Sequence, residues 1–288
     1  MRLALGTAQF GLSYGVANTS GQIDLNQGKL LLDCALKNGI NTLDTAIAYG
    51  NSEKRLGQIG VEKWHVVSKL PAVPDKCENV KEWVFEQVHN STNRLGIDQL
   101  YGLLLHKPKQ LLEPNGNLIY QSLIQLKAYG LLNKIGVSIY DPSELDLLCN
   151  EFDFDLIQAP FNIFDRRIVD SGWLFKLSNL GIEIHTRSAF LQGLLLMSRE
   201  SLPLKFSRWS LLLHEWLNWL EESNLSAAEA CLRYILSFLE INKVVVGVDN
   251  EIQLNELIRA ARGPLLKIPE NIKSNDINLI NPARWEFN

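Results

Sequence analysis

The sequence has little cysteine, no long hydrophobic run and no excess of positive charge, and each absence excludes a class of protein. Its four cysteines are far apart and form no CxxC pair, which argues against a metal site and a disulfide framework and favours a reduced, cytoplasmic setting. No apolar run approaches the length of a membrane span, and residues 1–6 are too short for a signal peptide. The net charge of −4 argues against nucleic acid or an anionic membrane as the main partner.

The length of the chain and its apolar content allow a large core. With 288 residues, 46% of them hydrophobic, the chain can form one barrel or two smaller domains. No linker rich in Pro, Gly or Ser divides it, so residues 1–288 are expected to form a single domain.

Short apolar runs alternate with longer amphipathic segments along the chain. The runs show little polar alternation, which favours parallel strands buried on both faces. Strands are predicted at 2–6, 40–44, 64–69, 100–105, 133–138, 155–159, 181–186 and 243–247. Helices are predicted between them at 26–38, 78–95, 117–129, 142–150 and 250–261. Eightfold strand–helix alternation predicts an α/β fold. It favours a (β/α)8 TIM barrel rather than a doubly wound sheet.

One interval, residues 187–242, is longer than the others and separates the seventh and eighth strands. It contains a loop, a Trp-rich segment at 208–220 and a second helix at 226–239. Leucines and tryptophans at helical spacing favour an added helix packed on the barrel, with a partner-binding face as the alternative. The tail after Pro269 is expected to fold across one end of the barrel.

Four polar residues lie at or just after the ends of apolar runs: Asp44, Tyr49, Lys69 and His106. In a parallel barrel their side chains would meet at the carboxyl face, where barrel enzymes place their chemistry. Such a set can deliver a proton to a carbonyl oxygen. Taken singly, each has a structural explanation, such as an ion pair, a loop aromatic or a core histidine. Their joint placement on successive strands favours an active site.

Ordered sequence blocks surround these residues. They are 43–46 (LDTA), 49–53 (YGNSE), 68–69 (SK), 105–106 (LH), 134–138 (KIGVS), 157–162 (IQAPFN) and 246–247 (VG). The set resembles the signature of the aldo-keto reductase superfamily over nearly the whole chain. The resemblance implies a barrel that binds NADP(H) or NAD(H) in extended form, without a Rossmann domain, and reduces aldehydes or ketones.

The expected chemistry follows from the side chains. Tyr49 is the general acid, but a phenol with a pKa near 10 needs help, so the ammonium of Lys69 is expected to lower that pKa. Asp44 would keep Lys69 charged and fixed, and His106 would orient the carbonyl. His185 also ends an apolar run and is a weaker candidate for the site.

The resemblance also assigns a cofactor-binding set. It comprises Gly6, Thr7, Ala8, Asp44, Ser138, Gln158, Arg187, Ser188, Phe190, Gln192, Gly193, Gly247, Asp249, Gln253 and Glu256. Ser138 and Gln158 are expected to bind the nicotinamide carboxamide. The loop through Gln192 and Gly193 is expected to wrap the pyrophosphate with backbone amides.

Two departures from the family pattern concern the nicotinamide. Ile139 replaces an asparagine that often follows the serine, and Arg187 replaces the aromatic residue that usually lies against the ring. A guanidinium can stack on a ring, although it would be repelled by the oxidised cofactor. Arg187 is therefore expected either to favour reduced cofactor or to point away and hold an acidic substrate.

A third departure concerns the adenosine end. Members that use NADPH place Lys, Arg or Ser where this chain has Asp249 and Glu251. An aspartate near the ribose disfavours a 2′-phosphate, which predicts relaxed or NADH-leaning selectivity. The alternative is that Asp249 only caps helix 250–261.

The sequence thus predicts a nicotinamide-dependent oxidoreductase acting on a small-molecule carbonyl substrate, and it leaves the oligomeric state unspecified. The alternative is a non-catalytic barrel that uses bound cofactor as a redox sensor or regulates a partner. A barrel hydrolase or lyase would need paired carboxylates or metal ligands at the strand ends, and only Asp44 lies there.

Overall fold

The computed structural model describes residues 1–13 and 21–285, and its centre is a closed barrel of eight parallel strands in chain order. The strands are β1 (Leu3–Gly6), β2 (Thr42–Asp44), β3 (His65–Leu70), β4 (Leu100–Leu105), β5 (Leu132–Ser138), β6 (Leu156–Pro160), β7 (Glu183–Arg187) and β8 (Lys243–Gly247). The barrel closes where Leu5 of β1 pairs with Val246 of β8. This confirms the predicted (β/α)8 TIM barrel, with strand ends displaced by a residue or two.

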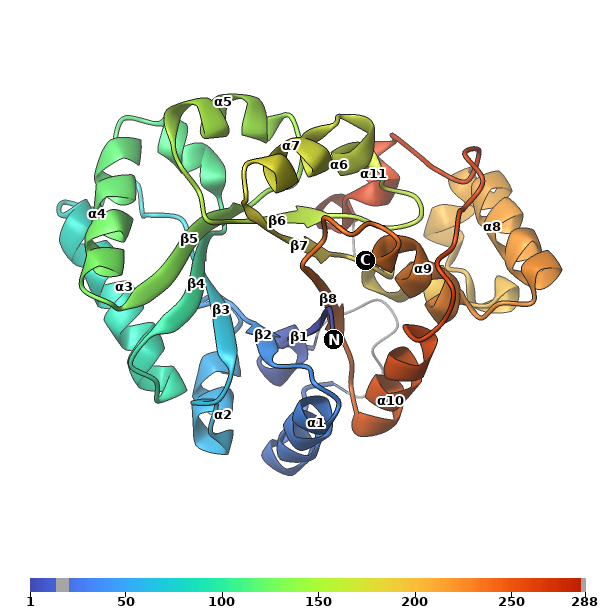
Figure 1. The fold of residues 1–288 in the computed structure, drawn as a ribbon, viewed down its shortest axis with the longest axis horizontal. Helices are drawn as coiled ribbons and strands as arrows, with labels where there is room; N and C mark the ends of the chain where they lie inside the picture. The colour runs from blue at the N-terminus through green and yellow to red at the C-terminus, as the bar shows by residue number, and fades with distance from the viewer. Residues whose placement is uncertain (14–20, 286–288) are drawn as a thin grey trace.

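Helices surround the barrel on the outside (Figure 1). They are α1 (Leu25–Lys37), α2 (Ser52–Ile59), α3 (Val80–Leu95), α4 (Gly116–Ala128), α5 (Glu144–Glu151), α6 (Arg167–Asp170), α7 (Trp173–Asn179), α8 (Ser210–Ser223), α9 (Ala227–Leu236), α10 (Glu251–Ala260) and α11 (Ile277–Ile280). Within the described ranges, no helix is both long and apolar enough to cross a membrane.

The helix boundaries differ from prediction where turn chemistry intervenes. Pro142, expected in a first helical turn, lies in the turn that precedes α5, and the helix begins at Glu144. The helix predicted over 226–239 ends at Leu236. The short helices α2, α6 and α7 were not predicted, because segments of four to eight residues give too little periodicity.

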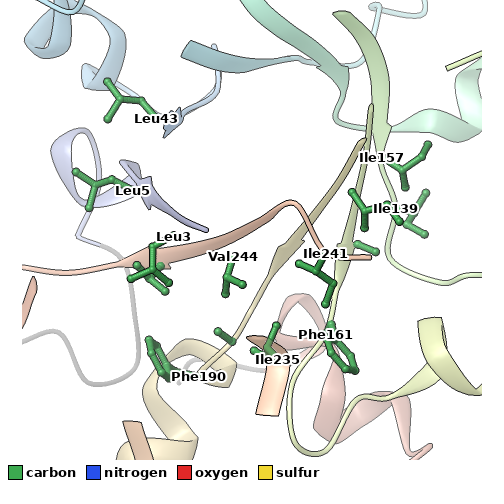
Figure 2. Close-up of a cluster of buried hydrophobic side chains, with 14 of the residues drawn as sticks. Leu3, Leu5, Leu43, Ile139, Ile157, Phe161, Phe190, Ile235, Ile241 and Val244 are labelled. Carbon is green, nitrogen blue, oxygen red and sulfur yellow. The ribbon is translucent and has the colours of Figure 1, made fainter. Parts of the chain in front are cut away.

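Side chains along each strand alternate between the helix layer and the barrel interior. Leu3 and Leu5 of β1, Val244 of β8 and Ile157 of β6 face outward and belong to the buried cluster that joins strands to helices (Figure 2). Ile235 of α9 contributes to the same cluster from the helix side. The residues between these positions therefore face the interior.

The barrel interior is filled, with an apolar layer in its middle. Val67, Leu104 and Leu156 form a small buried cluster of their own. They come from β3, β4 and β6, and Tyr101 packs against them. The interior is thus a packed core rather than a channel.

A polar network lies at the amino end of the barrel. Glu183 Oε2 accepts hydrogen bonds from the Tyr101 hydroxyl, at 2.7 Å, and from Lys134. Glu183 Oε1 is 2.7 Å from His185 Nε2. Burial alone would raise the pKa of Glu183, but these partners stabilise the carboxylate and bring its pKa down to about 2.

Strand β7 carries polar side chains through the whole height of the interior. Glu183, His185 and Arg187 pair with Leu156, Gln158 and Pro160 of β6. Their spacing of two puts all three on the inward face, so Arg187 is the member that reaches the carboxyl end.

The long segment between β7 and β8 supplies α8 and α9, and α8 lies at the periphery in Figure 1. Trp216 of α8 is buried, donates to the Leu195 carbonyl at 3.2 Å and stacks on Trp219 with ring centroids 5.7 Å apart. These contacts agree with the expectation that the Trp-rich segment packs on the molecule.

The tail folds back over the loop that follows β6. Arg166 Nη2 donates to the carbonyls of Pro269 and Ile272, and the Trp285 ring lies 4.8 Å from that of Phe206. The tail therefore lies on the carboxyl-end side of the barrel, one of the two positions that the sequence allowed.

Candidate active site

The site is built around a buried ion pair between neighbouring strands. Lys69 Nζ of β3 lies 2.6 Å from Asp44 Oδ1 of β2 and also donates to the Thr45 carbonyl at 2.9 Å. The two side chains are 1% and 7% exposed, so the charges are largely removed from water. A buried carboxylate and a buried ammonium are stable only when each compensates the charge of the other. This pairing fixes the ammonium in position.

Tyr49 is positioned by a tight turn and an anchored helix. A side chain at Gly11 would meet the Tyr49 carbonyl at 1.7 Å, and Gly50 has a φ of +53°, so the chain packs closely here only because both residues are glycine. Helix α2 follows at once. Its Glu53, 2% exposed, accepts hydrogen bonds from Ser68 and Ser91, both at 2.7 Å, and pairs with Arg94.

The structure brings the four predicted residues together. Lys69 Nζ lies 5.2 Å from the centre of the Tyr49 ring, and the rings of Tyr49 and His106 meet edge to face with centroids 6.0 Å apart. His106 directly follows β4 and Tyr49 lies in the loop after β2. All four thus gather at the carboxyl face of the barrel.

The pKa of Tyr49 differs from the sequence-based expectation. Burial raises it above the ordinary value, the negative charge of Asp44 raises it further, and Arg187 is the cation that opposes them. The expected lowering by Lys69 does not prevail, because Asp44 compensates the ammonium charge at 2.6 Å. Tyr49 is therefore a protonated phenol at neutral pH.

His106 is neutral at the same pH. Burial, followed by the positive charges of Lys69 and Arg187, lowers its pKa to about 4. A neutral imidazole has one N–H donor and one acceptor nitrogen, which suits it to bind a carbonyl oxygen without giving up a proton.

Ser138 and Gln158 form the next part of the site and are connected to the ion pair. Ser138 Oγ donates to Gln158 Oε1 at 3.1 Å, and Gln158 Nε2 donates to Asp44 Oδ2 at 2.6 Å. Both side chains are buried at adjacent strand ends. The Ser138 oxygen keeps its acceptor lone pairs, so it can receive the N–H of an amide.

The loop after β7 has unusual backbone geometry. Ser188, Leu191 and Gln192 have φ values of +63°, +48° and +54°, and Gly193 follows with +97°. Such conformations are costly for residues with a Cβ and recur at ligand sites. Runs of left-handed residues turn successive amides toward one side, an arrangement that suits phosphate oxygens.

Arg187 lies across the mouth of the site rather than in open solvent. Its Nη2 donates to the Ile139 carbonyl at 2.9 Å, its Nη1 donates to Ser188 Oγ at 3.3 Å, and its guanidinium carbon is 4.5 Å from the centre of the Tyr140 ring. One guanidinium face is thus taken by Tyr140. The side chain spans from β7 to the end of β5.

The predicted adenosine-binding residues lie at the start of α10. Gln253 accepts from the Asp249 amide at 2.9 Å through Oε1, and burial raises the pKa of Asp249. Asn250 is the residue that caps α10, since its Oδ1 accepts from the Gln253 amide at 2.9 Å. The alternative that Asp249 caps the helix is therefore wrong. Glu256 is exposed one turn further on.

The other predicted residues surround the ends of β1, β7 and β8. Thr7 supports Asp44, because its amide and Oγ1 both donate to the Asp44 carbonyl, at 2.9 and 3.0 Å. Phe190 has its ring in the hydrophobic core, so only its backbone faces the loop (Figure 2). Gly6, Ala8 and Gly247 lie at the carboxyl end of β1 and β8.

His185 does not join the four residues. It is fully buried, and its Nε2 pairs with Glu183 toward the amino end of the barrel. Among the described residues, no group of three or more His, Cys, Asp or Glu side chains could hold a metal ion.

Sequence reasoning missed two residues of the site. Tyr140 supports Arg187, and its position two residues after Ser138 was the available signal. Gln9 lies over the end of β8, where a Cβ on Gly247 would meet its Nε2 at 2.7 Å. No residue pattern pointed to Gln9.

Comparison with known protein families gives a match over nearly the whole chain. The family model described as "Aldo/keto reductase family" matches residues 2–270. The chain belongs to the aldo/keto reductase family. It is accordingly an oxidoreductase of an NAD(P)H-dependent enzyme family.

Individual relatives are distant in sequence. The aldo/keto reductase is 26% identical over 295 residues to an uncharacterized oxidoreductase of Bacillus subtilis (strain 168), YqkF, and the match covers 94% of both chains. Among solved structures, it superposes with a TM-score of 0.72 on the holo form of aldo-keto reductase AKR11C1 from Bacillus halodurans, at 21% identity over 92% of this chain and 88% of that one. Glycerol dehydrogenase AKR11B4 from Gluconobacter oxydans gives 0.70, at 22% identity over the same shares. The structural similarities support the fold.

Proposed function

We propose that this chain reduces an aldehyde or ketone with hydride from NAD(P)H and that Tyr49 supplies the proton. The observation that carries the proposal is the position of the Tyr49 ring. The ring centre lies 5.2 Å from the Lys69 ammonium and 6.0 Å from the centre of the His106 ring. A buried protonated phenol beside a neutral imidazole is a donor pair for an oxygen that becomes negative during reduction.

The four residues take separate roles in this mechanism. His106 donates its N–H to the substrate oxygen and orients the carbonyl. Tyr49 transfers its proton to the same oxygen as charge develops there. Lys69 holds a fixed positive charge against the phenol, which stabilises the phenolate that remains, and Asp44 keeps this ammonium charged and in place. In the reverse oxidation Tyr49 is the base.

The residues present fit a nicotinamide cofactor. When bound, the cofactor supplies the hydride. Ser138 and Gln158 would bind its carboxamide, and the left-handed backbone from Leu191 to Gly193 would cradle the pyrophosphate. Gly6, Thr7, Ala8, Ser188, Phe190 and Gly247 would contribute backbone and small side chains along the rim.

The adenosine end would lie at the start of α10. The helix N-terminus presents amides to an anion, whereas Asp249 opposes one. Gln253 and Glu256 would lie toward the adenine. We expect the two effects to offset each other, so that the enzyme accepts both NADH and NADPH or prefers NADH.

The test is oxidation of NADH and of NADPH, followed by absorbance, with 4-nitrobenzaldehyde as a generic substrate. Turnover with either cofactor that is lost on Tyr49→Phe supports the proposal. A well-folded protein that binds both cofactors and oxidises neither contradicts it and favours a non-catalytic cofactor sensor.

A further inference from the structure

Arg187 is a charged side chain at the reaction centre to which the proposed reduction assigns no bond with the substrate. Among the residues that the structure describes, no carboxylate forms an ion pair with its guanidinium. The side chain is partly buried at the carboxyl end of β7, and its charge acts on both Tyr49 and His106. The carboxylate of Asp165 acts on this charge electrostatically without bonding to it. A partly buried charge without a bonded counter-ion is costly, so a position that keeps one invites an anionic ligand.

The nearby carboxylates are already engaged. Asp44 holds Lys69 with one oxygen and Gln158 with the other. Asp165 is fully buried and accepts from Arg167 through both oxygens, each at 2.8 Å. The protein therefore offers Arg187 no bonded negative partner at this end of the barrel in the described part of the chain.

The guanidinium is held in one orientation by its neighbours. It stacks on Tyr140 and donates one hydrogen bond to the Ile139 carbonyl and one to Ser188 Oγ. A guanidinium has five N–H donors, so three remain for a ligand. Because the fork is fixed before the ligand arrives, little rotamer entropy is lost on binding.

A second positive charge lies at the same mouth. Lys107 directly follows His106, is exposed, and is among the charges that lower the pKa of His106. Lys107 and Arg187 thus place two positive charges near His106, although the chain as a whole carries a net charge of −4. Such a local field attracts small anions to an otherwise acidic protein.

We infer that Arg187, oriented by Tyr140, binds a carboxylate on the substrate, so that the preferred substrates are aldehydes or ketones bearing an acidic group. This inference rests on the proposed function. The carboxylate lies against the guanidinium while the carbonyl oxygen lies between Tyr49 and His106. The opposite charges hold the substrate in one orientation and contribute to binding in both ground and transition states.

The experiment compares two probes of nearly equal shape, 4-carboxybenzaldehyde and 4-nitrobenzaldehyde, on wild type and Arg187→Met. Wild type is expected to prefer the carboxylate. In Arg187→Met, the ratio of kcat/KM for 4-carboxybenzaldehyde to that for 4-nitrobenzaldehyde should fall about 10- to 100-fold, the value of a charged hydrogen-bonded contact. Any effect of the lost charge on Tyr49 and His106 acts on both probes and leaves this ratio unchanged. Arg187→Lys should recover only part of the preference, because a point charge lacks the fork.

Other outcomes overturn the inference. An equal loss for both probes means that Arg187 acts on Tyr49 or the cofactor rather than on a substrate carboxylate. A weakened cofactor Kd in Arg187→Met, measured by quenching of tryptophan fluorescence, assigns the guanidinium to a cofactor phosphate. Lys107→Met is the matched control, because it removes one positive charge at the same end of the barrel. If it reduced the preference for 4-carboxybenzaldehyde as much as Arg187→Met does, the preference would come from the overall electrostatic field and not from a binding site at Arg187.

Binding of the alcohol product keeps the inference testable apart from turnover. Calorimetric titration of the protein with oxidised cofactor and 4-carboxybenzyl alcohol should give a Kd at least about tenfold weaker in Arg187→Met than in wild type. If neither aldehyde is reduced but this difference is found, the proposed reaction fails and the carboxylate site remains. Equal Kd values overturn the site whatever the turnover.

Discussion

Gln158 donates its side-chain N–H to Asp44 Oδ2 at 2.6 Å, while Asp44 Oδ1 holds Lys69 at the same distance. One carboxylate therefore joins the residue expected to hold the cofactor carboxamide to the ammonium beside the proton donor. Both oxygens of Asp44 have bonded partners, which fixes the orientation of the carboxylate. A buried carboxylate without such partners would destabilise the fold. A change at any of the three side chains should disturb the other two.

Replacing the proton donor should separate chemistry from binding. We expect Tyr49→Phe to lower kcat by about 10²- to 10⁴-fold, the usual contribution of a general acid, and to leave cofactor Kd within a few-fold. Stopped-flow reduction and fluorescence titration measure the two quantities. Tyr101→Phe, at the opposite end of the barrel, is the matched control. Unchanged turnover in Tyr49→Phe would remove Tyr49 from the mechanism.

Removing the ammonium should cost both activity and stability. Lys69→Met leaves the Asp44 carboxylate buried and without its cation, which should lower the free energy of unfolding by about 3–5 kcal/mol. We expect the loss of kcat to be comparable to that of Tyr49→Phe. Denaturant unfolding and steady-state kinetics give the two values.

The double variant separates the two effects of Lys69. Adding Asp44→Asn to Lys69→Met removes the orphaned charge, so much of the stability should return while activity stays lost. A Lys69→Met enzyme that keeps wild-type turnover and the wild-type pH profile would show that the ammonium does not assist Tyr49.

The low pKa of His106 predicts a loss of stability in mild acid. With a folded pKa of about 4 against 6.5 for the free side chain, the unfolded chain binds more protons between these values, so stability falls as pH drops through this window. From pH 7 to pH 5 the imidazole should account for about 2 kcal/mol. Denaturant unfolding at both pH values should show a smaller loss for His106→Gln, and equal losses would contradict a depressed pKa.

Asp249 should influence the choice of cofactor. A 2′-phosphate placed near this carboxylate without a cation should lose about 1–2 kcal/mol, or roughly five- to thirtyfold in affinity. Asp249→Arg should therefore shift the preference toward NADPH by about tenfold, with Asp249→Asn as the size-matched neutral control. Titration of both cofactors measures the shift. A wild-type preference for NADPH beyond about a hundredfold would mean that a cation elsewhere grips the phosphate.

The barrel was predictable because burial on both faces of a parallel strand leaves a continuous apolar run, and because β1 to β8 follow one another without rearrangement. Asp44, Lys69 and His106 were predictable as a group, since strand ends meet at one face. The pKa of Tyr49 was not, because burial of the phenol and the nearby negative charge of Asp44 depend on packing in three dimensions.

Arg187 shows the same limit from another side. Its place at the end of β7 could be predicted from the sequence, and so could the two alternatives for its direction. The stacking on Tyr140 and the hydrogen bond to the Ile139 carbonyl could not, because both partners lie in the loop after β5, a strand that is not adjacent to β7 in the barrel. Short helices such as α6 were not predicted, because four residues are too few to show a helical spacing of apolar residues.

The polar column of β7 also protects the barrel against a folding error. If β7 slipped by one residue against β6, Glu183, His185 and Arg187 would turn into the apolar helix layer and Ile184 would turn toward the polar interior. The charges of Glu183 and Arg187 and the imidazole of His185 would then be buried without water or hydrogen-bond partners, so the misaligned pairing is unstable. The same side chains that equip the two ends of the barrel thus allow β7 only one register.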